Sequence, residues 1–289
     1  MLRSLLVLFL FSLYFCIPCF ALHSEGVSYT YKIGSLDFIS IKVLDTNMGK
    51  SILLNPGAEV VKRLMPDNQN PSSINVFVVK TGSKIVLIDT GVADGGDLIK
   101  NLAEAGITPD KVNIVLITHM HGDHIGGLLD INRHKVFKNA DVYVARPEID
   151  YWAGNIVNNA NSGLARDIQS VYGNRFKTFV WGEYIIPEIK AVKIQGHTPG
   201  HTAFEISSGN DKILVIGDMI HSLKVQIADP SIAVTFDVDP FQAVSARKRL
   251  FKEVAKDKTR IAGMHIPFPG VGIITENLDG GFFFNPLLK

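Results

Sequence analysis

Residues 118–127 read Thr-His-Met-His-Gly-Asp-His-Ile-Gly-Gly, so three histidines and one aspartate fall within six positions. The preceding residues, 112–117, are uncharged and rich in β-branched side chains, as in a short buried strand. We therefore expect residues 118–127 to form a loop at the carboxyl end of a strand. Open α/β sheets commonly bind their ligands at this position.

The side chains of this loop have the chemistry of a metal site. His119 and His121 are two residues apart and can point to the same side of an extended chain. Asp123 and His124 follow where the chain must turn, so they can face a second point. Imidazole and carboxylate groups together suit zinc or a similar divalent transition ion. The alternative is a polar loop whose histidines cluster without function, which a lone histidine would favour but four candidate ligands do not.

Three later segments carry the same kinds of side chain. Residues 196–202 read Gly-His-Thr-Pro-Gly-His-Thr, residues 213–218 read Ile-Leu-Val-Ile-Gly-Asp, and residues 263–270 read Gly-Met-His-Ile-Pro-Phe-Pro-Gly. In this order and spacing, they and residues 118–127 resemble the motifs of the metallo-β-lactamase superfamily. The resemblance implies an α+β fold, the four-layer αββα sandwich, in which two mixed sheets lie face to face with helices outside. Periodicity alone would indicate only an α/β class.

The resemblance also implies two divalent metal ions, zinc before manganese, cobalt or iron. By the family pattern, the ligands would be His119, His121 and His197 for one ion, Asp123, His124 and His265 for the other, and Asp218 as a bridge between them. Each ion would keep open positions for water and substrate, as catalytic sites require. Metal-bound water has its pKa lowered to roughly 7, so hydroxide would be available as a nucleophile. Asp123 or Asp218 could pass a proton to the leaving group.

Four further residues are expected beside these ligands. Asp89 follows a buried strand, where a carboxylate is costly unless it is paired, so it either orients a ligating histidine or caps a turn. His201 is expected to support a ligand or to lie satisfied in the core. His221 stands where some lactonase relatives place a tyrosine that hydrogen-bonds substrate, and is a candidate substrate contact. Phe268 either lines the substrate pocket or packs against its neighbours.

The substrate class rests on the resemblance to one branch of the family. The run 267–270, Pro-Phe-Pro-Gly, the run 236–240, Phe-Asp-Val-Asp-Pro, and an N-terminal leader most resemble the methyl parathion hydrolase-like branch. That branch hydrolyses phosphotriesters or esters, and close relatives open lactones. We therefore predict a dinuclear hydrolase of lactones or esters, with phosphotriesters as a side activity. A β-lactam hydrolase, an iron-dependent oxidoreductase and a non-catalytic metal binder are the alternatives.

Composition is that of an ordinary globular protein. The 289 residues are 46% hydrophobic and 20% charged, with 29 basic and 28 acidic side chains. Without Arg3 the two charges balance at 28 each, which gives no electrostatic reason to bind nucleic acid and disfavours a nuclease. We expect a small-molecule substrate. No Pro/Ser-rich linker separates the two halves, so residues 22–289 are predicted to form a single domain.

Residues 1–21 have the pattern of a signal peptide. Arg3 gives a positive start, the chain is then uncharged to Phe20, and Cys19-Phe20-Ala21 suits cleavage after Ala21. The alternative is an uncleaved anchor, because the uncharged run approaches spanning length. Cleavage would place the protein in the periplasm or outside the cell, without stable membrane association. Both cysteines lie in this leader, so the mature chain would need no disulfide.

Two polar segments are harder to assign. Residues 46–73 hold three prolines and are expected to form an irregular arm, which either shapes the mouth of the site, contributes to a homodimer contact or is a plain surface loop. Residues 154–173 are rich in Asn and poorly periodic. They either cover the site, with Trp152 and Tyr172 as apolar walls, or form a packed surface excursion. A long final helix is expected after Asp239 as cap and Pro240 as first residue.

Overall fold

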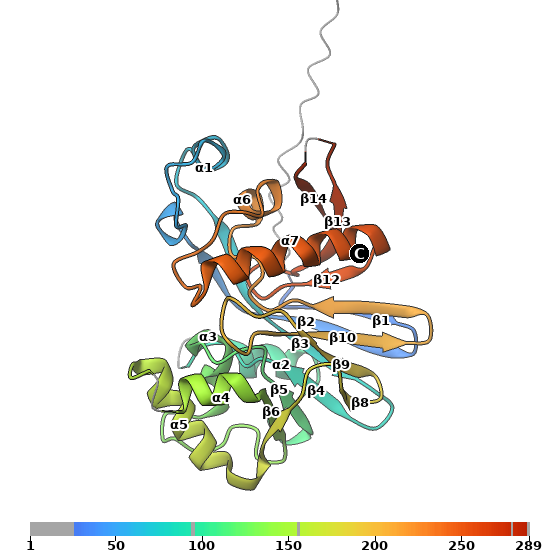
Figure 1. Ribbon diagram of the computed structural model, residues 1–289. Coiled ribbons are helices and arrows are strands. Elements are labelled where there is room, and N and C mark those ends of the chain that lie inside the picture. Colours follow the sequence, from blue (N-terminus) through green and yellow to red (C-terminus); the bar gives the residue numbers. More distant parts are fainter. Residues whose placement is uncertain (1–25, 94–95, 155–156, 279, 288–289) are drawn as a thin grey trace, which may run out of the picture.

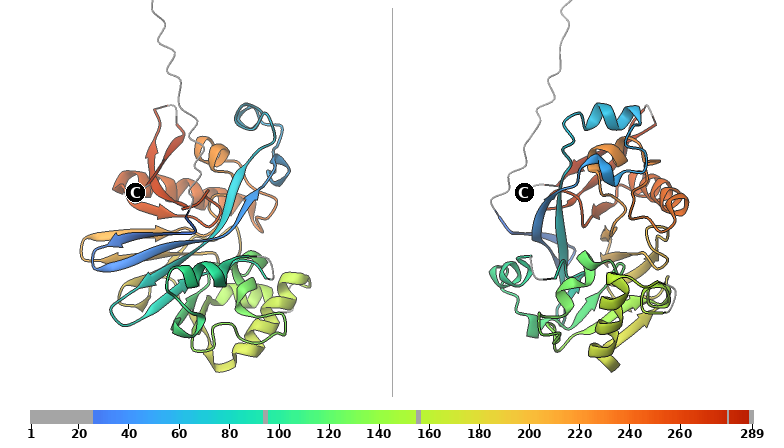
Figure 2. Two further views of the ribbon diagram at one scale, coloured as in Figure 1. Left: turned by 180° about the vertical axis from the view of Figure 1, so that it is seen from behind. Right: turned by 90° about the vertical axis from the view of Figure 1, so that its left-hand side faces the viewer.

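The computed structural model describes residues 26–93, 96–154, 157–278 and 280–287. Two seven-stranded sheets lie face to face, and helices cover their outer sides (Figure 1 and Figure 2). The predicted α+β class and the αββα sandwich are therefore confirmed. The predicted leader, residues 1–21, lies outside the described residues.

The first sheet is antiparallel at its N-terminal end and parallel beyond. β4, β5, β6 and β7 pair in parallel, whereas β1 to β4 pair antiparallel. Parallel strands end at the same edge, so the loop after β5 leaves the sheet at an edge shared with β4 and β6. In chain order the strands are β1 (Ser28–Ile33), β2 (Leu36–Asn47), β3 (Pro71–Lys80), β4 (Ile85–Ile88), β5 (Ile114–Leu116), β6 (Asp141–Ala145) and β7 (Phe176–Phe179).

The second sheet is antiparallel except where β11 and β12 pair in parallel. That exception places the carboxyl ends of β11 and β12 side by side, and the chain continues from them toward residues 218 and 265. The strands are β8 (Tyr184–Ile186), β9 (Ile189–Lys193), β10 (Thr202–Ser208), β11 (Asp211–Val215), β12 (Arg260–Ala262), β13 (Val271–Glu276) and β14 (Phe282–Pro286).

The helices divide between the two outer faces. The cluster outside the first sheet contains residues of α2, α4 and α5, and the cluster outside the second contains residues of α7 (Figure 1). A third cluster, between the sheets, holds residues such as Phe77 and Phe204. The helices are α1 (Glu59–Leu64), α2 (Leu98–Glu104), α3 (Gly122–Ile125), α4 (Arg146–Trp152), α5 (Ala160–Tyr172), α6 (Leu223–Ala228) and α7 (Pro240–Asp257), with short 3-10 turns at Lys50–Ile52, Pro109–Lys111, Gly126–Leu128 and Gly173–Arg175.

The final helix begins as the sequence predicts. Pro240 is its first residue, and the Asp239 side chain accepts a hydrogen bond from the backbone N–H of Gln242 over 2.9 Å. One face of α7 is buried against the second sheet. Its apolar members include Ala243, Ala246, Leu250 and Val254.

The two polar segments differ from the expectations. Residues 46–73 are not irregular throughout, because they contain α1, whose Val61 packs in a small cluster with α6 and residues 232–234. Residues 157–173 contain the helix α5, which a capping box at Asn159 starts. Tyr172 at its end is fully buried and donates to the carbonyl of Leu128, so it is a core residue and not a wall of the site.

No helix among the described residues is long and apolar enough to cross a membrane.

Candidate metal centre

Loops from both sheets meet at one point between them. The loop after β5 brings His119, His121, Asp123 and His124, of which the last two lie in the short helix α3. The second sheet contributes three side chains from loops after β9, β11 and β12, namely His197, Asp218 and His265. All seven predicted ligands are thus brought together, although they span much of the chain.

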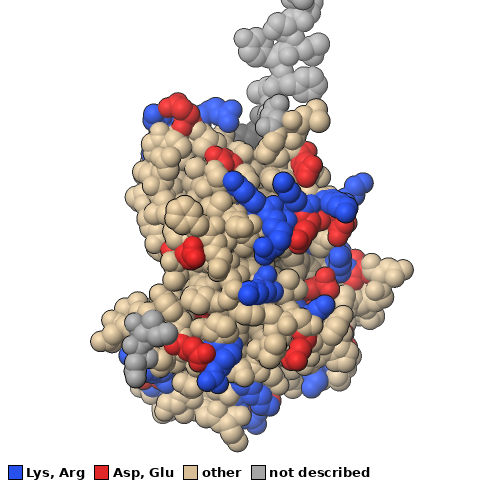
Figure 3. Space-filling view, in the orientation of Figure 1, with Lys and Arg blue, Asp and Glu red and all other residues tan. Residues whose placement is uncertain are grey.

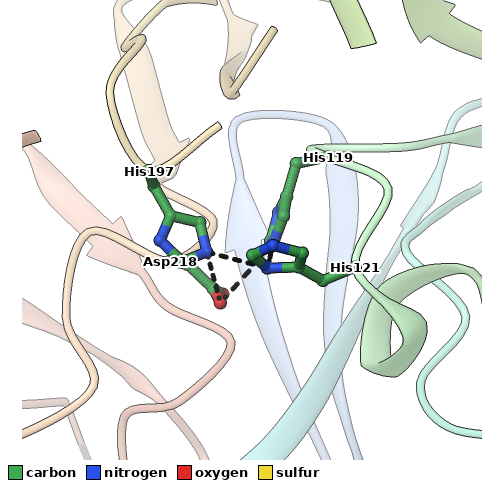
Figure 4. A group of neighbouring side chains, drawn as sticks. All are labelled: His119, His121, His197 and Asp218. Carbon is green, nitrogen blue, oxygen red and sulfur yellow. Dashed lines mark hydrogen bonds and ion pairs between the residues drawn. The ribbon is translucent and has the colours of Figure 1, made fainter. Parts of the chain in front are cut away.

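The first ligand group consists of His119, His121, His197 and Asp218, whose side chains point toward one another (Figure 4). His121 Nδ1 lies 3.0 Å from His119 Nε2 and 3.1 Å from His197 Nε2. Asp218 Oδ2 lies 3.6 Å from His119 Nε2 and 3.4 Å from His197 Nε2. In a tetrahedral zinc site with Zn–N bonds of about 2.1 Å, neighbouring ligand atoms are about 3.4 Å apart. The spacing of this group therefore fits one such ion.

The second ligand group consists of Asp123, His124 and His265, with Asp218 beside it. His265 Nε2 lies 3.3 Å from Asp123 Oδ2 and 3.0 Å from Asp218 Oδ2. His124 Nε2 lies 3.2 Å from Asp218 Oδ1, yet neither atom has a hydrogen-bond partner in the described protein. Buried polar atoms without a partner are costly, and a bound cation would satisfy both. Asp218 thus faces both groups, as a bridging ligand must.

Carboxylates behind the histidines hold the imidazole rings in place. Asp89 Oδ2 lies 2.6 Å from His124 Nδ1, and Asp89 also accepts from the backbone and the hydroxyl of Thr118. The sequence predicts that Asp89 either orients a ligating histidine or caps a turn, and its contact with His124 has the geometry of the first role. Asp237 Oδ1 lies 2.9 Å from His197 Nδ1 in the same way. Such contacts select the tautomer that leaves Nε2 free for a metal.

Glu148 joins the two ligand loops. It is fully buried in the first turn of α4. Its Oε2 accepts from the backbone N–H of Met120 over 2.9 Å, and its Oε1 accepts from that of Gly200 over 2.6 Å. One carboxylate therefore ties the loop that carries His119 to the loop that carries His197.

His201 supports Asp218. Its Nε2 accepts a hydrogen bond from the backbone N–H of Asp218 over 3.0 Å, and the ring is fully buried. The preceding Gly217 has φ +52°, and a Cβ there would come within 2.4 Å of His201 Nε2. Glycine is thus required for this approach, since its lack of a side chain removes both the clash and the strain.

The electrostatics separate the histidines into two kinds. Burial lowers the pKa of His119 well below its usual value and lowers the pKa of His121 to about 3. Burial acts in the same direction on His124 and His265, but Asp218 and the other nearby carboxylates outweigh it. They raise the pKa of His124 well above its usual value and that of His265 to about 10. The pKa of Asp218 itself is well below its usual range, because the histidines outweigh its burial.

A cavity of about 380 Å³ opens onto the centre. His221 lies on its wall, with its Nε2 3.1 Å from Asp218 Oδ2, where it can also reach a bound substrate. Phe268 is not among the residues that line the cavity. It is buried and packs on Tyr29, with ring centroids 5.5 Å apart, so it has the second of its two predicted roles, packing against its neighbours. The lining residues are Met48, His121, Gly122, Asp123, Asn161, Asp218, His221, Phe236 and His265.

A larger hollow of about 650 Å³ lies elsewhere, where α1, α6 and α7 meet β13 and β14. None of its lining residues belongs to either ligand group. Lys and Arg side chains gather over α7 on the face shown in Figure 3, with Asp and Glu side chains among them. Because it shares no residue with either ligand group, this hollow is separate from the metal centre.

Sequence reasoning missed several residues of the site. Asp237 and Glu148 contact the ligands or their loops from far along the chain, and no local pattern marks these contacts. Met48, Asn161 and Phe236 line the cavity from the arm, from α5 and from the loop before α7. Phe236 and Asp237 lie in a run that the sequence singles out, residues 236–240, whereas Met48, Glu148 and Asn161 do not lie in it.

Comparison with known proteins agrees with this geometry. The family model of the metallo-beta-lactamase superfamily matches residues 70–265. The chain belongs to this superfamily. A solved structure of the hydrolase AbOPH in the beta-lactamase superfamily superposes with TM-score 0.83 and 28% identity, over 92% of this chain and 99% of that one. AidC, a dizinc quorum-quenching lactonase in complex with a product, superposes with TM-score 0.82 and 26% identity, over 92% and 99%.

Curated relatives match over shorter stretches. A ribonuclease of Thermus thermophilus is 28% identical over 57% of this chain and 39% of its own length. The chain likewise spans 27% of the lactamase-like protein notP of an Aspergillus species. The named activities among relatives and structural neighbours are hydrolytic, which supports the prediction that this chain is an enzyme.

Proposed function

We propose that this chain is a dinuclear metal-dependent hydrolase of lactones or esters. The observation that carries the proposal is the convergence of His119, His121 and His197 on Asp218, which in turn reaches His124 and His265. Nitrogen and carboxylate ligands at these distances suit zinc, and manganese, cobalt or iron would use the same donors. Bound ions would supply a hydroxide near neutral pH and polarise the substrate's carbonyl oxygen.

The chain's own residues would perform the remaining tasks. Asp123 lines the cavity with its side chain 31% exposed, so it can reach a leaving group and pass it a proton. Asp218, at the floor of the same cavity, is the second candidate for this proton transfer. The Nε2 of His221 lies close enough to Asp218 to donate a hydrogen bond to a substrate oxygen held there.

The cavity wall favours an uncharged substrate with an apolar group. Phe236 is 46% exposed and its ring lies 5.8 Å from that of His221, while Met48 offers a second apolar surface. The residues of the described chain that line this cavity include no lysine or arginine. Lactones and simple esters need no such cation, whereas a β-lactam with its carboxylate or a nucleic acid with its phosphates would lack an ion-pairing partner here.

The comparisons and the sequence support finer parts of the proposal. The likeness to AidC and AbOPH over almost the whole of each supports a lactonase or esterase, with phosphotriesters as a side activity. The leader of residues 1–21 supports export to the periplasm or the medium, and the balanced charge supports a small-molecule substrate rather than nucleic acid. We also propose that two copies of the chain form a homodimer, with residues 46–73 at the contact.

Hydrolysis by the zinc-loaded protein tests the proposal directly. Proton release would be followed with acyl-homoserine lactones of several chain lengths, a phenyl ester, paraoxon and nitrocefin, each beside a His119→Ala control. We expect lactone or ester turnover that a chelator abolishes and zinc restores, and that the control lacks. Turnover of nitrocefin alone would replace the substrate class, and zinc binding without any turnover would leave a metal-binding protein. Iron in the purified protein with no hydrolysis would favour redox chemistry.

A further inference from the structure

One charged side chain outside the centre is completely enclosed. Arg247 of α7 is 1% exposed, and no carboxylate of the described residues lies within 4.0 Å of its nitrogens. A buried guanidinium without an ion pair is costly unless other groups satisfy its N–H donors. The groups that satisfy it therefore indicate what it does.

Arg247 donates three hydrogen bonds, all to backbone carbonyl groups. Its Nε donates to the carbonyl of Met219 over 2.7 Å. Its Nη1 donates to the carbonyls of Pro230 and Ile232 over 3.2 and 2.9 Å. A guanidinium has five donors in a fixed plane, so it can hold several carbonyls at once, which the single ammonium of lysine cannot do in the same geometry. Arg247 thus joins two loops that are separated along the chain.

Each of the two loops carries either a residue of the first ligand group or a residue that holds one of its histidines. The first loop, residues 216–222, contains Asp218, which is next to the residue whose carbonyl Arg247 holds. The second loop, residues 229–239, contains Asp237, whose Oδ2 accepts from the backbone N–H of Val234 over 3.0 Å and whose Oδ1 lies 2.9 Å from His197 Nδ1. Gln226 strengthens the same connection, because its side chain bonds the carbonyl of Ile232 and the backbone of residues 221–222.

We propose that Arg247 is a positioning residue for the first ligand group, fixing His197 relative to Asp218 by tying their two supporting loops together. The inference rests on the proposed metal centre and goes beyond it, since Arg247 touches neither ligand. The second ligand group shares only Asp218 with this arrangement, because Asp89 and the carbonyl of Ser73 hold its histidines from the opposite sheet. Removing Arg247 should therefore weaken one ion more than the other.

Stepwise zinc affinities provide the test. The purified protein and its Arg247→Met variant would be titrated with zinc against a chromophoric chelator, and His197→Ala and His265→Ala would assign each step to a group. We expect a loss of about 10–100-fold at the first ligand group, as for other residues that orient metal ligands. The affinity of the second group should change much less. Arg249→Met, an exposed site on the same helix, is the matched control and should leave both steps unchanged.

Several outcomes would overturn the inference. Equal weakening of both steps, or no change in either beside a lower melting temperature of the metal-free protein, would give Arg247 a purely structural role. Should Arg247→Met fail to fold, the same titration of Arg247→Lys, which keeps the stem and the charge, decides between the same results. Failure of the unaltered protein to bind zinc would instead overturn the proposed function, so the two failures are distinguishable.

Discussion

The two ligand groups share Asp218 but differ in exposure and in charge. The first is composed mainly of enclosed histidines, and burial lowers the pKa of His119 and His121, so both are neutral at physiological pH. The second opens to the cavity at Asp123, and its histidines have raised pKa values while no metal is bound. In the first group only His197 has a raised pKa, because Asp218 and Asp237 outweigh its burial, whereas both histidines of the second group have raised pKa values and must release protons to accept a cation. Both groups line the cavity, the first at His121 and the second at Asp123 and His265, so the main contrast between them is one of charge.

The largest effect should come from removing the residue that the two groups share. Asp218→Ala takes a carboxylate oxygen from both sets of ligands, so we expect metal content well below that of the unaltered protein and hydrolysis at background. Metal analysis after gel filtration, beside turnover, would measure it. Asp167→Ala, at a side chain of α5 that is 48% exposed and pairs with Arg133, is the control. Full metal content in Asp218→Ala would contradict the bridging role.

Single-ligand variants should separate the two groups. His197→Ala removes a ligand of the first group only, and His265→Ala one of the second only, so each should retain about half of the bound zinc. Both should lose most of the hydrolysis, because both ions would face the substrate. Metal analysis at saturating zinc checks the expectation. If either variant lost both ions, the groups would form one cooperative site and the comparison would fail.

Changes behind the histidines should have smaller and selective effects. Asp237→Asn should weaken zinc at the first group, and Asp89→Asn at the second, each by about 10–100-fold, because the amide no longer favours the ligating tautomer. Competition titrations resolve the two steps. Each variant serves as the control for the other, since it should leave the zinc affinity of the other group nearly unchanged. If Asp237→Asn weakened the second group, Asp89→Asn weakened the first, or both variants weakened both groups equally, the assignment of these carboxylates would be refuted.

Zinc binding should also depend on pH differently at the two groups. A histidine binds metal only when neutral, so at pH 7 His265, with its pKa raised to about 10, and His124 must release protons to the solvent. Affinity at the second group should therefore fall as pH falls. At the first group His119 and His121, with lowered pKa values, should release none, which leaves His197, whose pKa is raised, as the only histidine there that can release a proton. Calorimetry in buffers of different ionisation enthalpy counts the protons; equal release at both steps would contradict the electrostatic contrast.

The smallest effect concerns the cavity wall. Phe236→Ala should raise KM severalfold for lactones with long acyl chains and leave kcat and metal content nearly unchanged, because Phe236 contacts the cavity and not the ions. Phe241→Ala, which removes a ring that is 90% exposed and outside the cavity lining, is the matched control. An unchanged KM in Phe236→Ala at every chain length would show that the apolar group lies elsewhere.

Much of this architecture could be predicted from local patterns. The buried run before residue 118 and the capped start of α7 each depend on neighbours within a few positions. The helix α5 was missed because its many polar residues hide the periodicity. Its buried side, with Ala165 and Ile168, becomes evident only against the first sheet.

The sequence by itself determined which side chains of residues 118–127 could bind metal, because their spacing after a strand end is a local property of the chain, and the resemblance to the superfamily motifs added His197, Asp218 and His265. Only the tertiary structure decided what surrounds them. Asp237 lies 40 positions from His197, and Glu148 lies 28 and 52 positions from the two backbone groups it joins. The contacts of Glu148 with Met120 and of Asp237 with His197 arise from packing within each half of the molecule, and that of Glu148 with Gly200 from the packing of one sheet on the other. No periodicity of the sequence records such contacts.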